Sequence, residues 1–422
     1  MFHRFVCLCV VCAIGFYGNA PRAQAQEASS KATAKPRPKV VLSDAARKLH
    51  AECLVFDGHN DLPWTMRSKA GSSFDAADIA LPQERFHTDI PRLKAGGVGA
   101  QFWSAYVPAD TADEGVAAHQ VLEQIDLIYR MVRRYPETFE IARTADDVVR
   151  IRQTGKIASL IGLEGGHAIE NSLGLLRMYA SLGVRYMTLT HSDTLDWVDS
   201  ATDEARHQGL SEFGEEVVRA MNDLGMLVDI SHVSVDTMDD VLRVSRAPVI
   251  ASHSSTYALA PHPRNIPDEI LKKIQRNRGV VMVNFYSAYV MAESARVRAR
   301  AFEVEREFER KLGTREAVKQ AMNDWYDAHP VIQGTIHDVV DHIDHIVKVA
   351  GIDCVGLGSD YDGVPMVPDQ LDDVASYPLI TQTLLDRGYA AEEIKKIMGG
   401  NALRVLREAE QVSADSRIPQ LK

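Results

Sequence analysis

Eight short runs of β-type residues, each followed by a stretch with helical character, constrain this 422-residue chain more than any other feature. The apolar part of each run is nearly continuous, as in parallel strands that helices cover. The runs occupy residues 54–61, 98–107, 157–166, 184–191, 225–232, 248–255, 280–286 and 354–363. Eight strands that alternate with helices predict an α/β fold, a (β/α)8 TIM-type barrel rather than an open sheet.

The connection between the seventh and eighth runs is oversized. It begins at residue 287 and contains the charged helix-forming run ESARVRARAFEVEREFERKLGTREAVKQAMNDW. The simplest interpretation is an exposed helical insertion at residues 287–335. A lid or a subunit contact is the alternative, because long insertions in compact domains often carry function.

The first residues indicate a secretory signal. Arg4 precedes the apolar run FVCLCVVCAIGFY, which is too short to span a bilayer, and the small residues Ala23 and Ala25 predict cleavage after Ala25. An uncleaved anchor is the alternative. We therefore expect a signal peptide at 1–25, a flexible tether at 26–42, one catalytic domain at 43–410 and a C-terminal tail at 411–422. The mature chain would be periplasmic or secreted, without a transmembrane segment.

Charge and cysteine content narrow the class of protein. The formal net charge of −11 argues against a nucleic-acid partner, which would need a basic face, and leaves small molecules and peptides open. Outside the signal only Cys53 and Cys354 remain, which make no disulfide framework and no cysteine zinc cluster. These cysteines fall on the first and last strands, which are neighbours in a closed barrel. A bridge between adjacent parallel strands is awkward, so two reduced buried thiols are expected, with a disulfide as the alternative.

Side chains that can bind metal ions or transfer protons lie at the ends of most of the predicted strands. Catalytic groups of such barrels lie at the carboxyl ends of the strands, on one rim. Six of the eight runs supply seven candidate ligands or acid–base groups there, namely His59, Asp61, Glu164, His191, His232, His253 and Asp360. On the first strand alone, His59 and Asp61 share a face and could equally form a hydrogen-bonded pair. Their coincidence with five similar residues favours a metal centre.

The ligand types favour zinc, for which imidazole nitrogen and carboxylate oxygen are good donors. Two ions are expected, because the cluster holds more ligands than one tetrahedral ion needs. A paired site requires a bridging carboxylate and places a nucleophilic hydroxide between the cations. Glu164, at the end of its strand and followed by two glycines, is the natural bridge.

Seven segments then resemble the signatures of the membrane (renal-type) dipeptidase family, zinc-dependent dipeptidases on a (β/α)8 fold related to the amidohydrolases. The segments are DGHNDLPW, LEGGHAI, YMTLTHS, SHVS, SHSS, HPRNIPDE and GLGSDYDG, and they occur in family order between about residues 50 and 405. The resemblance implies that His59 and Asp61 hold one zinc, that His232 and His253 hold the other, and that Glu164 bridges them.

The resemblance also implies roles around the substrate. His191 would contact the scissile carbonyl and its developing oxyanion, and Arg264 would bind the substrate carboxylate. Asp360 would lie near the attacking water. We expect it to orient that water and pass its proton to the leaving nitrogen, with support of a ligand histidine as the alternative. Tyr286 and Asn265 are further candidates for substrate binding. The implied activity is hydrolysis of dipeptides, with a D-residue accepted at the C-terminal position, and the implied assembly is a homodimer.

Two other functions stay open at this stage. The same centre on the same barrel could hydrolyse a cyclic amide, a lactone or a phosphoester, because the chemistry is shared. A non-catalytic peptide-binding protein is a third hypothesis, against which the intact ligand set speaks. The segment SDTLDWVDSATDE after His191 departs from the family pattern, which leaves the substrate preference undecided.

Several other histidines are not expected to bind metal. His337, His342 and His345 fall on a helical pattern before the last strand, away from the rim. His167 follows Glu164 closely but comes after its glycines, so a contact with a ligand residue is expected rather than coordination.

Overall fold

Nine parallel strands form the sheet in the computed structural model, which describes residues 37–415. They are β1 (Val55–Asn60), β2 (Val98–Tyr106), β3 (Phe139–Ile141), β4 (Ile157–Glu164), β5 (Val184–Thr188), β6 (Leu227–Asp229), β7 (Ile250–Ala251), β8 (Val280–Val283) and β9 (Val355–Leu357). Every run expected from the sequence contains one strand. The sequence did not predict β3, which is only three residues long and lies along the start of β4.

Eight of these strands close into a barrel. The order β2-β1-β9-β8-β7-β6-β5-β4 is joined into a ring by pairing of β2 with β4, while β3 lies outside the ring. The predicted (β/α)8 barrel is therefore confirmed. Because all strands are parallel, their carboxyl ends meet on one rim, and the polar residues that follow them gather there.

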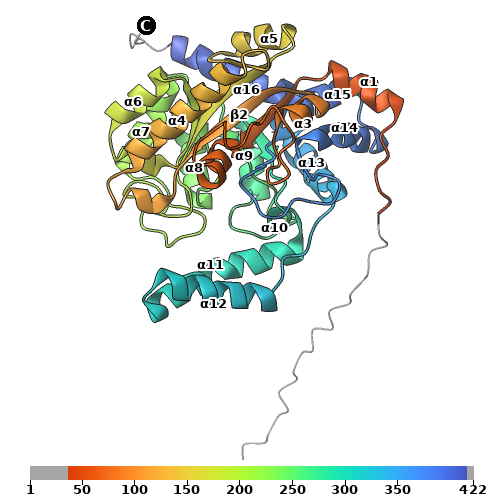
Figure 1. Cartoon of the computed structure of the whole chain (residues 1–422). Coiled ribbons are helices and arrows are strands. Elements are labelled where there is room, and N and C mark those ends of the chain that lie inside the picture. Colours follow the sequence, from red (N-terminus) through yellow and green to blue (C-terminus); the bar gives the residue numbers. More distant parts are fainter. Residues whose placement is uncertain (1–36, 416–422) are drawn as a thin grey trace, which may run out of the picture. The chain divides into compact units, whose positions relative to one another are not determined.

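Helices surround the barrel (Figure 1). The α-helices among the described residues are α1 (Asp44–Glu52), α2 (Leu62–Ala70), α3 (Ile90–Ala95), α4 (Ala117–Arg134), α5 (Ala145–Gln153), α6 (Leu173–Ser181), α7 (Glu212–Asp223), α8 (Val235–Val244), α9 (Asp268–Asn277), α10 (Ser287–Val290), α11 (Ala292–Leu312), α12 (Arg315–Ala328), α13 (Ile336–Ala350), α14 (Tyr377–Asp386), α15 (Ala391–Lys395) and α16 (Asn401–Ala414), of which all but α11 and α12 lie around the barrel. Local sequence fixes many of their starts. Thr144, for example, accepts from the backbone of Asp147, whose side chain returns the bond in a capping box at α5.

The interior of the barrel is packed rather than hollow. Alternate strand residues point inward, and Phe56, Phe102 and Tyr186 meet there in one buried cluster. Helix α16 contributes Val405 and Leu406 to the same cluster. Aromatic rings of this size fill the cross-section, which leaves the carboxyl-end rim as the open part of the barrel.

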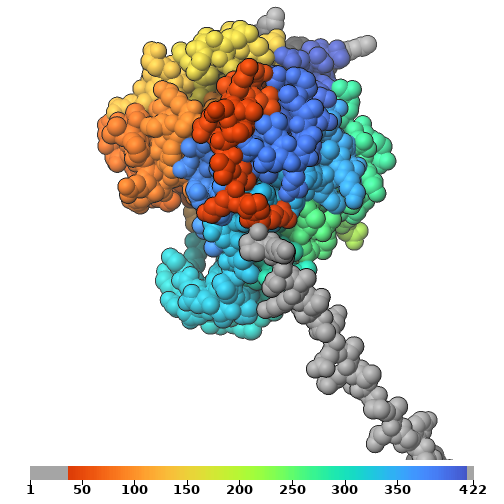
Figure 2. Space-filling model, turned by 90° about the vertical axis from the view of Figure 1, so that its right-hand side faces the viewer, coloured from red at the N-terminus to blue at the C-terminus, as the bar shows by residue number. Residues whose placement is uncertain are grey.

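The insertion after β8 is helical, as expected. Helices α11 and α12 form a pair that stands apart from the barrel helices in Figure 1 and projects from the molecule in Figure 2. The pair has a small core of its own in which Ala301, Val304 and Met322 are buried. Its position at the carboxyl-end rim follows from its place in the chain, directly after β8 and α10.

Three further expectations concern the chain outside the barrel. Cys53 and Cys354 are free and buried, as predicted, but they lie just before β1 and β9 rather than on these strands. Among residues 37–415, no helix is both long and apolar enough to cross a membrane. The expected signal peptide at 1–25, and all but the end of the tether at 26–42, lie outside the described residues, as does most of the tail at 411–422. The division of the chain into these segments stays a prediction.

Candidate active site

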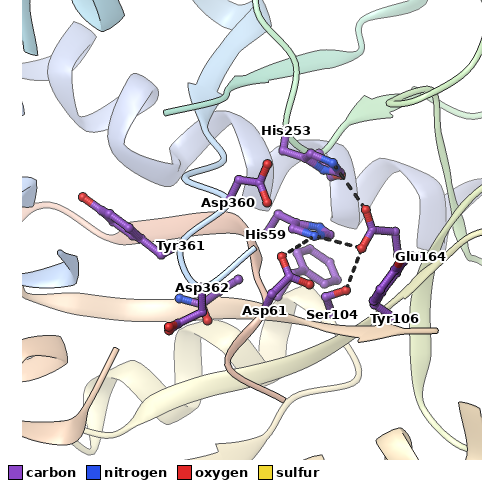
Figure 3. Close-up of polar contacts among 12 residues, drawn as sticks. His59, Asp61, Ser104, Tyr106, Glu164, His253, Asp360, Tyr361 and Asp362 are labelled. Carbon is purple, nitrogen blue, oxygen red and sulfur yellow. Dashed lines mark hydrogen bonds and ion pairs between the residues drawn. The ribbon is translucent and has the colours of Figure 1, made fainter. Parts of the chain in front are cut away.

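Five of the predicted ligands lie close together at the rim, and Figure 3 shows four of them, His59, Asp61, Glu164 and His253. His59 is on β1, Asp61 directly precedes α2, Glu164 ends β4, and His232 and His253 follow β6 and β7. Three triads each have ligand atoms within 4.8 Å of one another, namely His59–Glu164–His253, Glu164–His191–His232 and His59–Asp61–Asp360. Residues separated by up to three hundred positions meet because each follows a strand of the same closed barrel.

Glu164 lies at the centre of this cluster. Its Oε2 is 3.3 Å from His59 Nε2, while its Oε1 is 3.1 Å from His232 Nε2 and 3.5 Å from His253 Nε2. The hydroxyl of Ser104, on β2, donates to Oε2 at 3.0 Å. Burial alone would raise the pKa of Glu164, but the charge of His59 and the hydrogen bond from His232 hold it well below its usual value. Glu164 is therefore a carboxylate with each oxygen turned to a different histidine.

The second group of ligand atoms contains two carboxylates and one imidazole. His59 Nε2 lies 3.2 Å from Asp61 Oδ2, and Asp360 completes the triad. Asn284, directly after β8, donates to Asp360 Oδ2 at 2.8 Å. Burial and the negative charge of Asp61 raise the pKa of Asp360 well above its usual value. Such crowding of acids is unfavourable unless a cation or a proton compensates it.

Neighbouring side chains orient the imidazoles. His59 Nδ1 lies 2.7 Å from Tyr186 Oη, and His253 Nδ1 lies 2.7 Å from Ser252 Oγ. The Ser252 hydroxyl in turn donates to Asp229 at 2.6 Å. Each ring therefore uses Nδ1 for the protein and turns Nε2 to the cluster, the arrangement usual for metal-ligating histidines.

Backbone conformation at the rim is unusual. His232 and Asp360 have φ values of 69° and 63°, in the left-handed region of backbone conformation that residues other than glycine rarely adopt. Close packing adds a second constraint at Gly363, where a Cβ atom would lie 2.2 Å from Asp61 Oδ2 and 2.5 Å from Asp360 Oδ1. The loop after β9 can therefore approach the two carboxylates only because residue 363 is glycine.

A cavity of about 740 Å³ opens above the cluster. Its walls include the ligand residues Asp61, Glu164, His232 and His253, together with aromatic side chains. Its further lining residues are Trp64, Tyr106, His191, Arg264, Tyr286, Tyr289, Phe302, Tyr326 and Asp360, among others. A volume of this size admits a small organic molecule with a few polar groups.

The other predicted substrate residues differ in their positions. His191 lines the cavity 3.8 Å from Glu164, and burial lowers its pKa. Arg264 and Tyr286 also line it, and both are largely buried. Asn265 is not part of the cavity lining. Its amide donates to the backbone oxygens of Ala260 and Tyr289, each at 2.8 Å, which ties the loop that carries Arg264 to its surroundings instead.

Comparison with known proteins identifies the family. A family description for membrane dipeptidases, peptidase family M19, matches residues 43–420. The chain belongs to this family. Membership confirms the resemblance on which the sequence assignments rested.

Individual relatives and solved structures support this family membership. Dipeptidase tcpJ from Claviceps purpurea (strain 20.1) is 40% identical over 390 residues, which cover 89% of this chain and 83% of that protein. The crystal structure of the probable dipeptidase PvdM from Pseudomonas aeruginosa superposes with a TM-score of 0.76 at 25% identity, over 87% of this chain and 98% of the other. A metallopeptidase from Rhodobacter sphaeroides, solved with a phosphinate mimic of the dipeptide L-Ala-D-Ala, has a TM-score of 0.68 at 26% identity, over 85% and 99%.

The residues present fit the metal that a metallopeptidase family implies. His59 Nε2 is buried and has no hydrogen-bond partner, although two carboxylate oxygens lie near it. Burial lowers the pKa values of His232 and His253 well below the ordinary value, which favours the neutral ring that metal coordination requires. Imidazole nitrogens and carboxylate oxygens together form a donor set for a divalent cation of borderline softness.

Sequence reasoning missed the residues that support this dipeptidase site. Tyr186 and Ser252 orient histidines, Ser104 contacts Glu164, and Asn284 contacts Asp360. Ser252 directly precedes the predicted ligand His253, and Asn284 directly follows β8. A search of the strand ends for all polar residues would therefore have found both. Tyr186 points into the barrel from the middle of a strand, where the pattern predicts only packing.

The histidines set aside from the sequence lie elsewhere. His342 is buried on α13, where its Nδ1 accepts from the backbone of Thr256 and its Nε2 lies 3.1 Å from Val290 O. His345 pairs with Asp268 at 2.7 Å. His167 Nε2 lies 3.1 Å from Val107 O. None of these three belongs to the groups of possible ligands found among residues 37–415.

Proposed function

We propose that this chain is a dipeptidase with two zinc ions, which hydrolyses the peptide bond of dipeptides. The observation that carries the proposal is the position of Glu164, whose two carboxylate oxygens lie near His59 on one side and near His232 and His253 on the other. Membership in the membrane dipeptidase family supports the substrate class. The similar metallopeptidase solved with a dipeptide mimic supports a dipeptide as the substrate.

The proposed ligands form two sets that share one residue. His59, Asp61 and Glu164 would hold one ion, and Glu164, His232 and His253 would hold the other, in keeping with the short distances that join these side chains. When bound, the two cations would supply an activated water as nucleophile and polarise the scissile carbonyl.

Chain residues would handle charge and protons around the scissile bond. His191 lines the cavity within 3.8 Å of Glu164 and stacks at 4.3 Å between ring centroids on His232, so its imidazole can donate to the carbonyl oxygen as negative charge develops there. Asp360, which Asn284 holds in place, can accept a proton from the attacking water and deliver it to the leaving nitrogen.

Arg264 would fix the free C-terminus of the substrate. Its side chain is 1% exposed yet lines the cavity, with Nη1 and Nη2 bonded to Ser254 Oγ and His253 O and with Nε unpaired. A guanidinium held in this way presents fixed donors to a carboxylate. A longer peptide would place a neutral amide there, so the clamp favours dipeptides. Tyr286 would line the adjoining wall.

Kinetics on four substrate types tests the proposal. Purified protein loaded with Zn²⁺ is assayed on L-Ala-L-Ala, L-Ala-D-Ala and the N-acetylated and C-amidated forms of the L,L dipeptide. We expect hydrolysis of both free dipeptides and a loss of about tenfold or more in kcat/KM on amidation. Absence of dipeptide turnover, with turnover of a cyclic amide, lactone or phosphoester, would assign the site to another hydrolase. Equal turnover of free and amidated forms would remove the clamp role of Arg264.

Export and self-association belong to the same proposal. Cleavage after Ala25 would release the chain to the periplasm or the medium, where small peptides are available. The homodimer remains a prediction from the family. N-terminal sequencing of exported protein and light scattering test the two points separately.

A further inference from the structure

One arginine of the insertion reaches the proposed active site. Arg298 lies on α11, and its side chain lines the main cavity together with Tyr286 and Arg264. It also lines an adjoining cavity of about 860 Å³. The proposed reaction gives Arg298 no task.

The contacts of Arg298 leave one edge of its guanidinium open. Nη1 donates to the hydroxyl of Tyr326 at 2.6 Å, and the guanidinium carbon lies 4.1 Å from the centroid of the Phe302 ring. Nε is buried without a hydrogen-bond partner. Among residues 37–415, no hydrogen bond engages Nη2 and no carboxylate lies within ion-pair distance of the group. Nε and Nη2 form one side of the planar fork, which can grip a carboxylate through two parallel bonds.

The Arg298 guanidinium therefore has no ion-pair partner among the described residues. Arginine does not lose its proton in proteins, and a partly buried charge without an opposite charge is costly. Glu305, further along α11, lines the adjoining cavity but not the main one. The charge of Arg298 partly opposes the burial that raises the pKa of Glu305, but the two side chains form no ion pair. The hydroxyl of Tyr326 and the face of Phe302 hold the cation without neutralising it. An anion in the main cavity would supply the missing charge.

Aromatic contacts place Arg298 on the same side of the cavity as Arg264. The ring of His262 lies 4.7 Å from Tyr289 and 6.0 Å from Phe302, measured between centroids. Tyr289 in turn lies 5.3 Å from the guanidinium carbon of Arg264, while Phe302 lies under Arg298. The two arginines therefore flank one aromatic group. A substrate whose C-terminal carboxylate met Arg264 would bring the side chain of its C-terminal residue towards Arg298.

We propose that Arg298 binds the side-chain carboxylate of an acidic C-terminal residue, so that the enzyme prefers dipeptides ending in Glu or Asp. This specificity site rests on the proposed dipeptidase function. It belongs to the insertion between β8 and α13 rather than to the barrel, so it assigns that insertion a role in substrate selection.

Pairs of dipeptides that differ only in charge test the inference. The zinc-loaded protein is assayed on Ala-Glu against Ala-Gln and on Ala-Asp against Ala-Asn, since each pair has side chains of almost equal size. We expect kcat/KM to be about tenfold or more higher for at least one acidic member, mainly through KM, because a remote contact acts in the ground state and the transition state alike. In Arg298→Gln the ratio should fall to about one, with Ala-Gln turnover little changed, and Arg298→Lys should retain part of the preference.

Arg296→Gln is the matched control, because it removes the same charge from an exposed position on the same helix. It should keep the wild-type ratio. Thermal melting of each variant shows whether it is folded. If Arg298→Gln does not fold, the ratio of the wild type and that of Arg298→Lys still test the acid preference. Equal turnover of the acidic and amide forms by the wild type overturns this inference but leaves the proposed dipeptidase function intact. An acid preference at the N-terminal residue instead, seen as Glu-Ala above Gln-Ala, overturns the placement near Arg264. Failure to hydrolyse any dipeptide overturns the proposed function and this inference with it.

Discussion

The Nε2 atoms of His232 and His253 lie 2.9 Å apart, at the ends of two neighbouring strands. Both rings are buried, and Glu164 Oε1 is 3.1 Å from the first and 3.5 Å from the second. Three acceptor-capable atoms so close together repel one another unless protons or a cation lie between them. The stability of the site should therefore depend on its metal.

Metal removal should lower both stability and activity. A cation that binds only the folded state stabilises it by about 3 kcal/mol when its free concentration is a hundred times the dissociation constant. We expect dialysis against a chelator to abolish hydrolysis and to lower the melting temperature, and added Zn²⁺ to restore both. Calorimetry with and without metal measures the shift. Identical melting curves for both forms would show that the cluster binds no cation.

Replacing Glu164 by Gln should impair metal binding with little change in the fold. The substitution keeps the shape of the side chain but removes the negative charge that two sets of histidines share. We expect bound zinc to fall from about two ions to one or fewer per chain, with a loss of at least about a hundredfold in kcat/KM. Metal analysis by mass spectrometry gives the stoichiometry. Ser104→Ala, which removes one hydrogen bond to the same carboxylate, should cost far less, and a larger loss there would contradict the bridging role.

Gly363→Ala should affect the site more than the fold. The added methyl group would enter the space of the Asp61 and Asp360 carboxylates, at 2.2 and 2.5 Å. Displacing these oxygens by a few tenths of an ångström is expected to lower kcat/KM by about tenfold to a hundredfold. Gly174→Ala in α6 is the control, because its nearest neighbour would be 3.2 Å away and alanine favours helix. Normal activity of Gly363→Ala at normal zinc content would show that the two carboxylates need not hold these positions.

Stability should decline as the pH falls below neutrality. Burial lowers the pKa of His87, His167 and His342 to about 4 in the folded chain, against an ordinary value of 6.5. Between these values the unfolded chain binds protons that the folded chain does not. The contribution of these histidines to the free energy of unfolding is therefore fully present above pH 6.5. It is lost as the pH falls towards 4, by up to about 1.4 kcal/mol per pH unit for each histidine.

His342→Gln isolates one of these contributions. Denaturant unfolding between pH 5 and 7.5 should show a smaller pH slope in this variant than in the wild type, whatever its stability at pH 7.5. His119→Gln on α4 is the control, since that side chain is 74% exposed and should leave the slope unchanged. An unchanged slope in His342→Gln would mean that the ring is protonated in the folded state.

The main features of the site could be predicted from the sequence because strand ends mark the rim of a parallel barrel. His59, Glu164 and His253 each follow an apolar run, and closure of the ring brings them together whatever the details of packing. Asn265, a candidate for substrate binding that does not follow a strand, lies outside that rule. Its amide donates to the backbone oxygens of Ala260 and Tyr289 and does not line the cavity.

The sequence by itself determined the fold class and the identities of the candidate ligands, since periodicity and strand ends are local properties of the chain. Only the tertiary structure decided which imidazole nitrogen faces the cluster, because Tyr186 orients His59 from 127 positions away. It also decided that Arg298 reaches the cavity. Helical character predicts that the insertion folds, but the direction in which such a helix returns to the barrel depends on packing between residues far apart in the chain.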